Sequence, residues 1–268
     1  MLVDIGVNLS SSRFSGDVEN VLIRAEESSV KKIILTGTSI SETEACIEIC
    51  EQYKSQFPGM LYATAGIHPH EASSFNNSAI DAIAHLAQHS SVVAVGETGL
   101  DFNRNFSPKK MQERAFEAQI ELAVNCQLPL FLHERDASKR QLEILKSYQN
   151  SLPKAVIHCF TGDKKALFNY LDLDLYIGIT GWVCDERRGS DLQNIVKNIP
   201  LNRLMVETDA PYLLPRNMPE LPKNRCNEPA NLTYVIDGIA AHRDESPSTI
   251  AKSSSATAIE FFNLVSSS

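Results

Sequence analysis

The sequence lacks the features that mark several common classes of protein. No apolar run reaches the ~18 uninterrupted residues that a membrane-spanning helix needs, so we expect no membrane partner. The first residues, MLVDIGVNLS, have no basic flank before a long apolar stretch, and we therefore expect no signal peptide. Positive charge is not in excess, since the formal net charge is −8. This argues against a generally basic nucleic-acid binder but leaves room for a local basic patch.

Paired cysteines and several catalytic motifs are missing as well. The six cysteines contain no CxxC pair, which is typical of reduced thiols in a cytoplasmic protein. The chain has no GxSxG, HExxH, GxGxxG or Gly-rich GK[ST] segment, so the common signatures of hydrolases, zinc peptidases and nucleotide-binding folds are absent. A Ser-His-Asp triad stays open, although no segment points to one.

Short apolar segments of consecutive residues are frequent. They lie at 2–6, 32–36, 61–67, 92–97, 129–133, 154–158, 175–180 and 203–208. An apolar run without alternation is typical of a strand that is covered on both faces. Eight such strands alternating with helices predict a single-domain (β/α)8 TIM barrel over residues 1–268, with an open doubly wound sheet as the alternative.

Helical spacing of apolar residues, at i, i+3, i+4 and i+7, lies between these segments. It begins at Val18, Cys46, Ile80, Leu192 and Leu232. Helix starts are indicated by the capping-box pairs Ser41/Glu44 and Ser78/Asp81 and by the dipeptide Ser107-Pro108.

Histidines and carboxylates follow five of the eight predicted strands. They are His68 and His70 after the third strand, Glu97 at the end of the fourth, His133 of the fifth, His158 of the sixth and Asp209 of the eighth. In a barrel, the carboxyl ends of all strands meet at one rim, where active sites are built. Each residue alone has a simpler reading, as a hydrogen-bonded histidine, a helix cap or a turn residue. Their joint placement instead indicates one shared site.

The chemistry of these side chains predicts a metal site. Neutral imidazoles and ionised carboxylates are the usual ligands of borderline divalent cations. Glu97 follows the apolar run VVAVG, and a buried, unpaired carboxylate would carry a large desolvation cost. A cation held by Glu97, His133, His158 and Asp209 would remove that cost.

Several blocks of the sequence resemble one known family. The segments DIGVNL, GIHPH, GETGLDFNRN, HCFTG, YIGITGW, ETDAPYLLP and NEPANL are similar to the TatD family of metal-dependent nucleases, in the amidohydrolase-like superfamily. The similarity runs in order from residue 3 to about residue 265. The resemblance implies a (β/α)8 barrel and a cytoplasmic 3′–5′ exonuclease of single-stranded DNA and RNA, linked to repair of oxidative damage. It also implies magnesium as the cofactor.

The resemblance assigns roles to individual residues. Glu97, His133 and His158 match the metal ligands of the family. Asp209 matches an aspartate that acts as ligand or base, and His68 matches a histidine implicated in activity. We accordingly expect Asp209 and His68 to be catalytic.

Two departures from the wider family bear on the site. Many relatives begin with Asp-x-His-x-His, whose histidines bind metal, whereas this chain has Asp4, Gly6 and Asn8. The TatD branch shares this form, so the family assignment stands, but a full two-metal site is in doubt. Cys226 stands where close relatives have an arginine, which leaves Arg225 as the nearby cation.

The sequence gives weaker indications of which metal binds and of which residues contact the substrate. Magnesium prefers oxygen ligands, whereas a site with two histidines suits manganese or zinc. His70, Arg187 and Arg225 are predicted to bind substrate, with ordinary solvated charge as the alternative for each arginine. We expect a monomer. The competing functions are another amidohydrolase-type hydrolase of small amides, lactones or phosphoesters, and a metal-poor nucleic-acid-binding protein without turnover.

Overall fold

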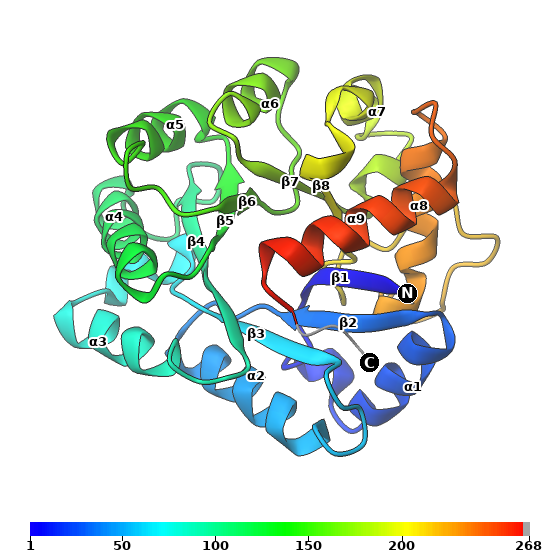
Figure 1. Cartoon of the computed structure of the whole chain (residues 1–268), viewed down its shortest axis with the longest axis horizontal. Coiled ribbons are helices and arrows are strands. Elements are labelled where there is room, and N and C mark those ends of the chain that lie inside the picture. Colours follow the sequence, from blue (N-terminus) through cyan, green and yellow to red (C-terminus); the bar gives the residue numbers. More distant parts are fainter. Residues whose placement is uncertain (265–268) are drawn as a thin grey trace.

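Parallel strands run in chain order around a ring in this computed structural model, which describes residues 1–264 (Figure 1). The strands are β1 (Leu2–Val7), β2 (Val30–Leu35), β3 (Leu61–Ala65), β4 (Val92–Asp101), β5 (Leu130–Arg135), β6 (Ala155–Ile157), β7 (Tyr176–Ile179) and β8 (Leu204–Val206). Each pairs in parallel with the next, and a parallel bridge between Val7 and Ala210 joins the two ends. The predicted (β/α)8 barrel is confirmed, and the open sheet is wrong. The domain limits 1–268 stay a prediction, because residues 265–268 lie outside the described part.

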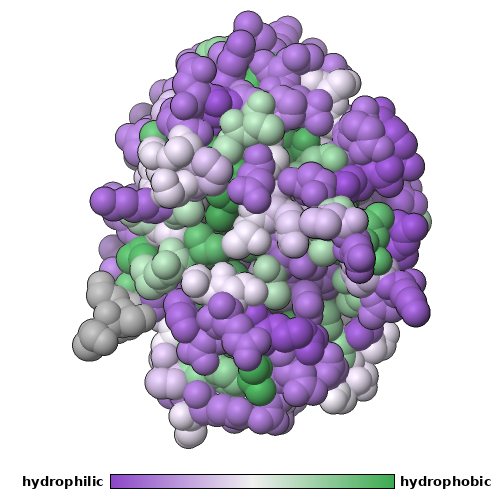
Figure 2. Space-filling model, turned by 90° about the vertical axis from the view of Figure 1, so that its right-hand side faces the viewer, coloured by the Kyte–Doolittle hydropathy of each residue, from purple (hydrophilic) through white to green (hydrophobic). Residues whose placement is uncertain are grey.

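Helices surround the ring of strands. They are α1 (Val18–Glu27), α2 (Ile40–Tyr53), α3 (Asn77–Leu86), α4 (Lys109–Cys126), α5 (Ser138–Ser147), α6 (Lys164–Leu171), α7 (Ser190–Ile195), α8 (Leu232–Ala240) and α9 (Pro247–Phe261). Each of α1 to α8 turns buried apolar residues toward the strands. The side of the molecule that carries α1 and α8 is mainly hydrophilic, with apolar side chains in small separate groups (Figure 2). Over residues 1–264, no helix is long and apolar enough to cross a membrane.

Two of the predicted helix caps are wrong by two residues. The side chain of Ser39, not Ser41, accepts a hydrogen bond at the start of α2. Asn76, not Ser78, does the same for α3. In both cases a polar residue two positions earlier can also cap the helix. The first helical turn therefore begins two residues before the predicted start.

The fourth strand is longer than predicted. It continues past Glu97 to Asp101, and its pairing with β5 shifts register between Val95 and Thr98. This irregularity lies at Glu97 and turns its side chain toward the end of the barrel. His133 likewise lies inside β5, whereas Asp209 comes three residues after β8 ends.

Helix α9 covers the amino-terminal end of the barrel. It lies across the ring of strands in Figure 1 and contacts β1 and β8. Phe261 and Phe262 pack in one buried cluster with Val3, Ile34 and Tyr62, which lie inside or near the start of their strands. Because this end is filled, a site built by several strands has to lie at the opposite, carboxyl-terminal end.

Candidate metal centre and active site

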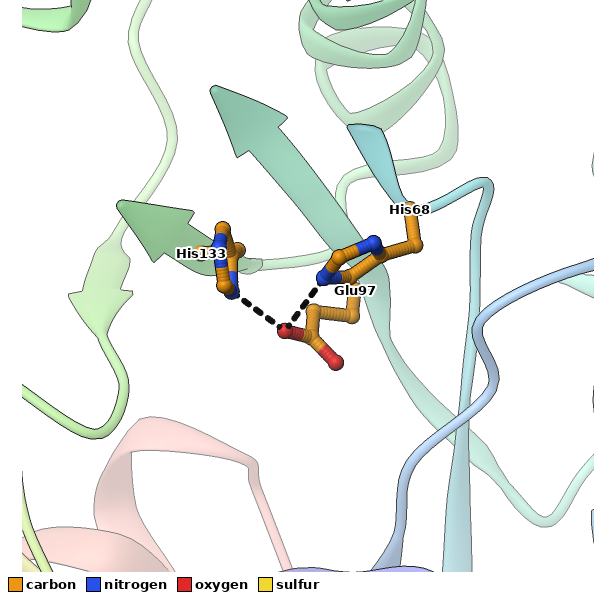
Figure 3. A group of neighbouring side chains, drawn as sticks. All are labelled: His68, Glu97 and His133. Carbon is orange, nitrogen blue, oxygen red and sulfur yellow. Dashed lines mark hydrogen bonds and ion pairs between the residues drawn. The ribbon is translucent and has the colours of Figure 1, made fainter. Parts of the chain in front are cut away.

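One carboxylate oxygen of Glu97 is the meeting point of three imidazoles. Glu97 Oε1 lies 2.8 Å from His158 Nε2, 2.9 Å from His133 Nδ1 and 3.3 Å from His68 Nε2. Figure 3 shows His68 and His133 approaching this oxygen from two sides, while the second carboxylate oxygen points away from both. The side chains come from β4, β5 and the segments after β3 and β6, so four parts of the barrel build the cluster.

The donor atoms fit a small divalent cation. Single ligand atoms of His68, Glu97 and His133 all lie within 4.8 Å of one another. Ligands that bind a cation at about 2.1 Å are themselves about 3.0–3.4 Å apart, and the distances of 2.9 Å and 3.3 Å from Glu97 Oε1 to His133 and His68 are close to this range. The donors are imidazole nitrogens and one carboxylate, which is the chemistry of a borderline metal site.

The charge of Glu97 is balanced by imidazoles in this structure. Burial raises the pKa of Glu97, but the charges of His158 and His68 and hydrogen bonds from His133 and His158 hold it well below its usual value. For His158, burial lowers the pKa, yet the carboxylates of Glu97 and Glu207 raise it well above normal. A buried carboxylate thus requires positive charge beside it, which imidazolium or a bound cation can supply.

Asp209 lies in the same cavity but, like His158, outside the group of His68, Glu97 and His133. Its Oδ1 accepts a hydrogen bond from Asn8 Nδ2 at 3.3 Å. Loss of hydration and the nearby charges of Glu207 and Glu97 outweigh His158 and raise the pKa of Asp209 to about 7. A carboxylate with this pKa can accept a proton near neutral pH. The predicted role of Asp209 as a metal ligand stays a prediction.

Asp101 is a member of the site that the sequence analysis did not identify. Its Oδ2 contacts His70 Nε2 at 2.7 Å and His133 Nε2 at 3.3 Å. Because Asp101 contacts Nε2 of His133, the other ring nitrogen, Nδ1, faces Glu97. Asp101 therefore fixes the orientation in which this imidazole can bind a metal. The segment GLDFNRN contains Asp101, but the predicted strand ends at Glu97 and leaves Asp101 in the following loop.

Glu207 is the second unpredicted member and is completely buried. It accepts a hydrogen bond from the backbone N–H of Cys159 and lies 3.3 Å from His158 Nδ1. A Cβ at Gly6 would overlap its Oε2, so the glycine in place of the family's first histidine leaves room for this carboxylate. The proximity of Glu207 to Asp209 in ETDAP is the signal that could have identified it.

Ser107 positions the loop that carries two of the histidines. Its hydroxyl donates to the His70 carbonyl oxygen at 2.8 Å and accepts from the Ser73 amide at 2.9 Å. The predicted role of Ser107 as a helix cap is wrong, since Pro108 occupies that position at the start of α4.

A cavity of about 700 Å³ opens above the cluster. His68, Glu97, His133, His158 and Asp209 line it together. Of the predicted substrate-binding residues, His70 also lines it, whereas Arg187 and Arg225 do not. Arg187 pairs with Asp185 at the rim, and the side chain of Arg225 is exposed.

Comparison with known proteins decides the family. A sequence model of the family described as TatD related DNase matches residues 3–263. The chain belongs to the TatD-related DNase family. The predicted family, and with it the class of nuclease-type hydrolase, is confirmed.

Named relatives of this TatD-family chain align with it over nine-tenths or more of their length. A protein named 3′-5′ ssDNA/RNA exonuclease TatD from Salmonella typhimurium is 46% identical, over 98% of this chain and 100% of the relative. One of the same name from Klebsiella pneumoniae is 48% identical over 91% of each chain. Crystal structures of a TatD family hydrolase from Entamoeba histolytica and a TatD homolog from Escherichia coli are each 26% identical, with TM-scores of 0.88. They cover 97% and 98% of this chain and the same shares of their own chains.

Proposed function

We propose that this chain is a metal-dependent 3′–5′ exonuclease that hydrolyses phosphodiester bonds of single-stranded DNA and RNA. The observation that carries the proposal is the convergence of three imidazoles on the Glu97 carboxylate, inside a cavity of a TatD-family barrel. The relatives whose names state this activity align with nearly the whole chain, so their substrate class extends to it by similarity.

Glu97, His133 and His158 are the proposed metal ligands, and the structure favours His68 as a further donor. Burial lowers the pKa of His68 and outweighs the carboxylate of Glu97, which favours the neutral imidazole. A neutral imidazole is a better metal ligand than a proton donor. Magnesium is the metal implied by the resemblance, while the excess of imidazole donors favours manganese or zinc.

Glu97, His133 and His158 would hold a divalent cation that would acidify a bound water and neutralise charge on the non-bridging phosphate oxygens. Asp209, with its pKa near 7, is the proposed acceptor of the proton that the attacking water loses. The new bond joins this water oxygen to phosphorus, and the bond between phosphorus and the O3′ of the preceding nucleotide breaks. A proton then goes to O3′, and a 5′-mononucleotide leaves.

The biological setting is proposed from the resemblance alone. It comprises a cytoplasmic location, a monomeric state and a role in DNA repair under oxidative stress. None of the site's geometry depends on these points.

Product analysis tests the function. A single-stranded 20-nucleotide substrate, labelled at its 5′ end, should give a ladder that shortens with time, whereas a 3′ label should appear at once as a mononucleotide. Metal-stripped protein should regain this activity on adding one divalent ion. Glu97→Ala should be inactive with every ion.

Three results would overturn the proposal. Equal release from both ends would contradict the polarity. Cleavage of model esters or amides but of no oligonucleotide would favour the amidohydrolase-type alternative. Oligonucleotide binding without cleavage in any metal would favour a binding protein without turnover.

A further inference from the structure

A second cavity adjoins the active-site cavity at the same end of the barrel. Its volume is about 360 Å³, against about 700 Å³ for the first. Glu134, Arg135 and Thr161 line both, so the two cavities meet at these residues. A chain-like substrate whose end lies at Glu97 can therefore continue past Arg135 into the second cavity.

Arg135 is the cation at this junction. Among the described residues, it is the only arginine or lysine that lines the active-site cavity. Its Nη1 donates to Thr161 Oγ1 at 2.9 Å, which holds the guanidinium at the boundary. Most of its donors stay available, because a guanidinium has five N–H groups.

Trp182 has two arginine side chains close to its ring. The guanidinium carbons of Arg135 and Arg188 lie 5.3 Å and 4.4 Å from the centre of the Trp182 ring. Arg188 is itself held by Asp185, with 2.9 Å between Nη2 and Oδ2. Both Trp182 and Arg188 line the second cavity. Two guanidinium groups and one indole are the groups that bind phosphate and stack on a base in single-stranded nucleic acid.

Acidic side chains also line the second cavity, but three of the four already accept hydrogen bonds. Glu134 accepts from the Ala137 amide at 2.8 Å. Asp163 accepts from the Ala166 amide at 2.7 Å as the cap of α6. Asp136 accepts from an asparagine side chain at 2.7 Å. These hydrogen bonds orient the three carboxylates toward protein donors, while the fourth, Asp191, is exposed. A phosphate in this cavity therefore has to lie close to the two guanidinium groups.

We propose that the second cavity is a subsite for the penultimate nucleotide of the strand. Arg135 and Arg188 bind the 5′-phosphate of that nucleotide, and its base packs against the Trp182 ring beside the two guanidinium groups. The inference rests on the proposed exonuclease function, which places the 3′-terminal nucleotide in the first cavity with its phosphate at the metal centre. Such a subsite also favours single strands, because a base that packs against a protein side chain cannot pair with a second strand.

Two dinucleotides that differ by one phosphate test the subsite. TpT and pTpT share the scissile bond, and only pTpT carries the phosphate proposed to contact Arg188. The ratio of kcat/KM for pTpT over TpT should be about ten in the wild type, the size expected of one charge-assisted contact. Arg188→Ala should reduce this ratio to about three, because only Arg135 then contacts the phosphate. The control is Arg216→Ala, which removes a rim cation that pairs with Glu186 and lines neither cavity.

A third substrate, pTpT without its penultimate base, tests the stacking contact. The wild type should prefer intact pTpT by roughly five-fold or more, and Trp182→Leu should lose this preference. If the wild type shows no phosphate preference, or if Arg188→Ala keeps it in full, the subsite is wrong although the exonuclease function stands. If no variant and no wild-type protein cleaves any of the three substrates, the proposed function itself fails.

Discussion

The buried carboxylate of Glu207 gives the sharpest prediction about the metal centre. It faces two hydrogen-bond donors, the backbone N–H of Cys159 and Nδ1 of His158. Nε2 of His158 lies 2.8 Å from Glu97 Oε1, and a proton kept on Nδ1 leaves the Nε2 lone pair available when a metal replaces the proton between Nε2 and Glu97. Glu207 is thus a positioning residue that selects the tautomer able to bind metal.

Glu207→Gln preserves the shape of the side chain but removes one acceptor. An amide offers one oxygen and one NH2 group, so it cannot accept from both Cys159 and His158. The buried Cys159 amide retains the oxygen, and the NH2 group then faces His158. His158 has to accept at Nδ1, which moves its proton to Nε2 and blocks the metal ligand.

Loss of such an outer contact costs about 10–100-fold in metal affinity, or about 1.4–2.7 kcal/mol. We expect the Kd for Mn²⁺, measured by calorimetric titration of metal-stripped protein, to rise by this factor in Glu207→Gln. Glu186→Gln is the control, because Glu186 is an exposed carboxylate that pairs with Arg216. An unchanged Kd in a folded Glu207→Gln variant would refute the assignment of Glu207.

Three further predictions concern proton transfer, backbone geometry and metal binding. Asp209 has its pKa raised to about 7 in the metal-free site, so kcat should rise with pH as this carboxyl group loses its proton, and Asp209→Asn should lose both this rise and at least ~100-fold in rate. A pH profile that keeps its rising limb in Asp209→Asn would exclude this residue as the base. Gly99 has φ +139° and its Cβ would overlap the carbonyl oxygen of His133, so Gly99→Ala should lower the free energy of unfolding by ~3 kcal/mol in urea denaturation. A loss below ~1 kcal/mol would contradict this close approach. Mn²⁺ at 100 times its Kd should raise the free energy of unfolding by about 2.7 kcal/mol, and Glu97→Gln should lose most of that gain. Equal stabilisation of both proteins would place the ion elsewhere.

The barrel was predictable because its strands are covered on both sides. Segments such as KIILT and PLFLH show no alternation, and their burial by helices outside and side chains inside explains why. Helix α9 was not predicted, since the segment PSTIAKSSSATAIEF is rich in serine and carries few apolar residues at helical spacing. Its helix depends on tertiary packing over the barrel end.

Helix starts were predicted less well because local signals overlap. The pair Ser39/Glu42 has the same capping-box spacing as Ser41/Glu44, and the structure selects the earlier one. The choice depends on where β2 ends and how the connecting loop reaches the helix. That information is not contained in the four-residue pattern.

The residues of the site also differ in how well the sequence predicts them. His133 and His158 follow apolar runs and were recognisable as candidates from their positions. Asp101 and Glu207 were not, because their roles depend on contacts with those histidines that arise only when neighbouring strands align. Arg187 and Arg188 are adjacent in the sequence, yet only Arg188 lines a cavity beside the active site. Sequence position alone cannot separate them.

The central claim, that Glu97 and the surrounding imidazoles hold a divalent cation, is tested most directly by anomalous diffraction from crystals soaked in Mn²⁺. We predict a peak at the manganese edge within about 2.3 Å of Glu97 Oε1 and of nitrogens of His133 and His158. A peak elsewhere in the barrel, or none at this carboxylate at saturating Mn²⁺, would contradict the account.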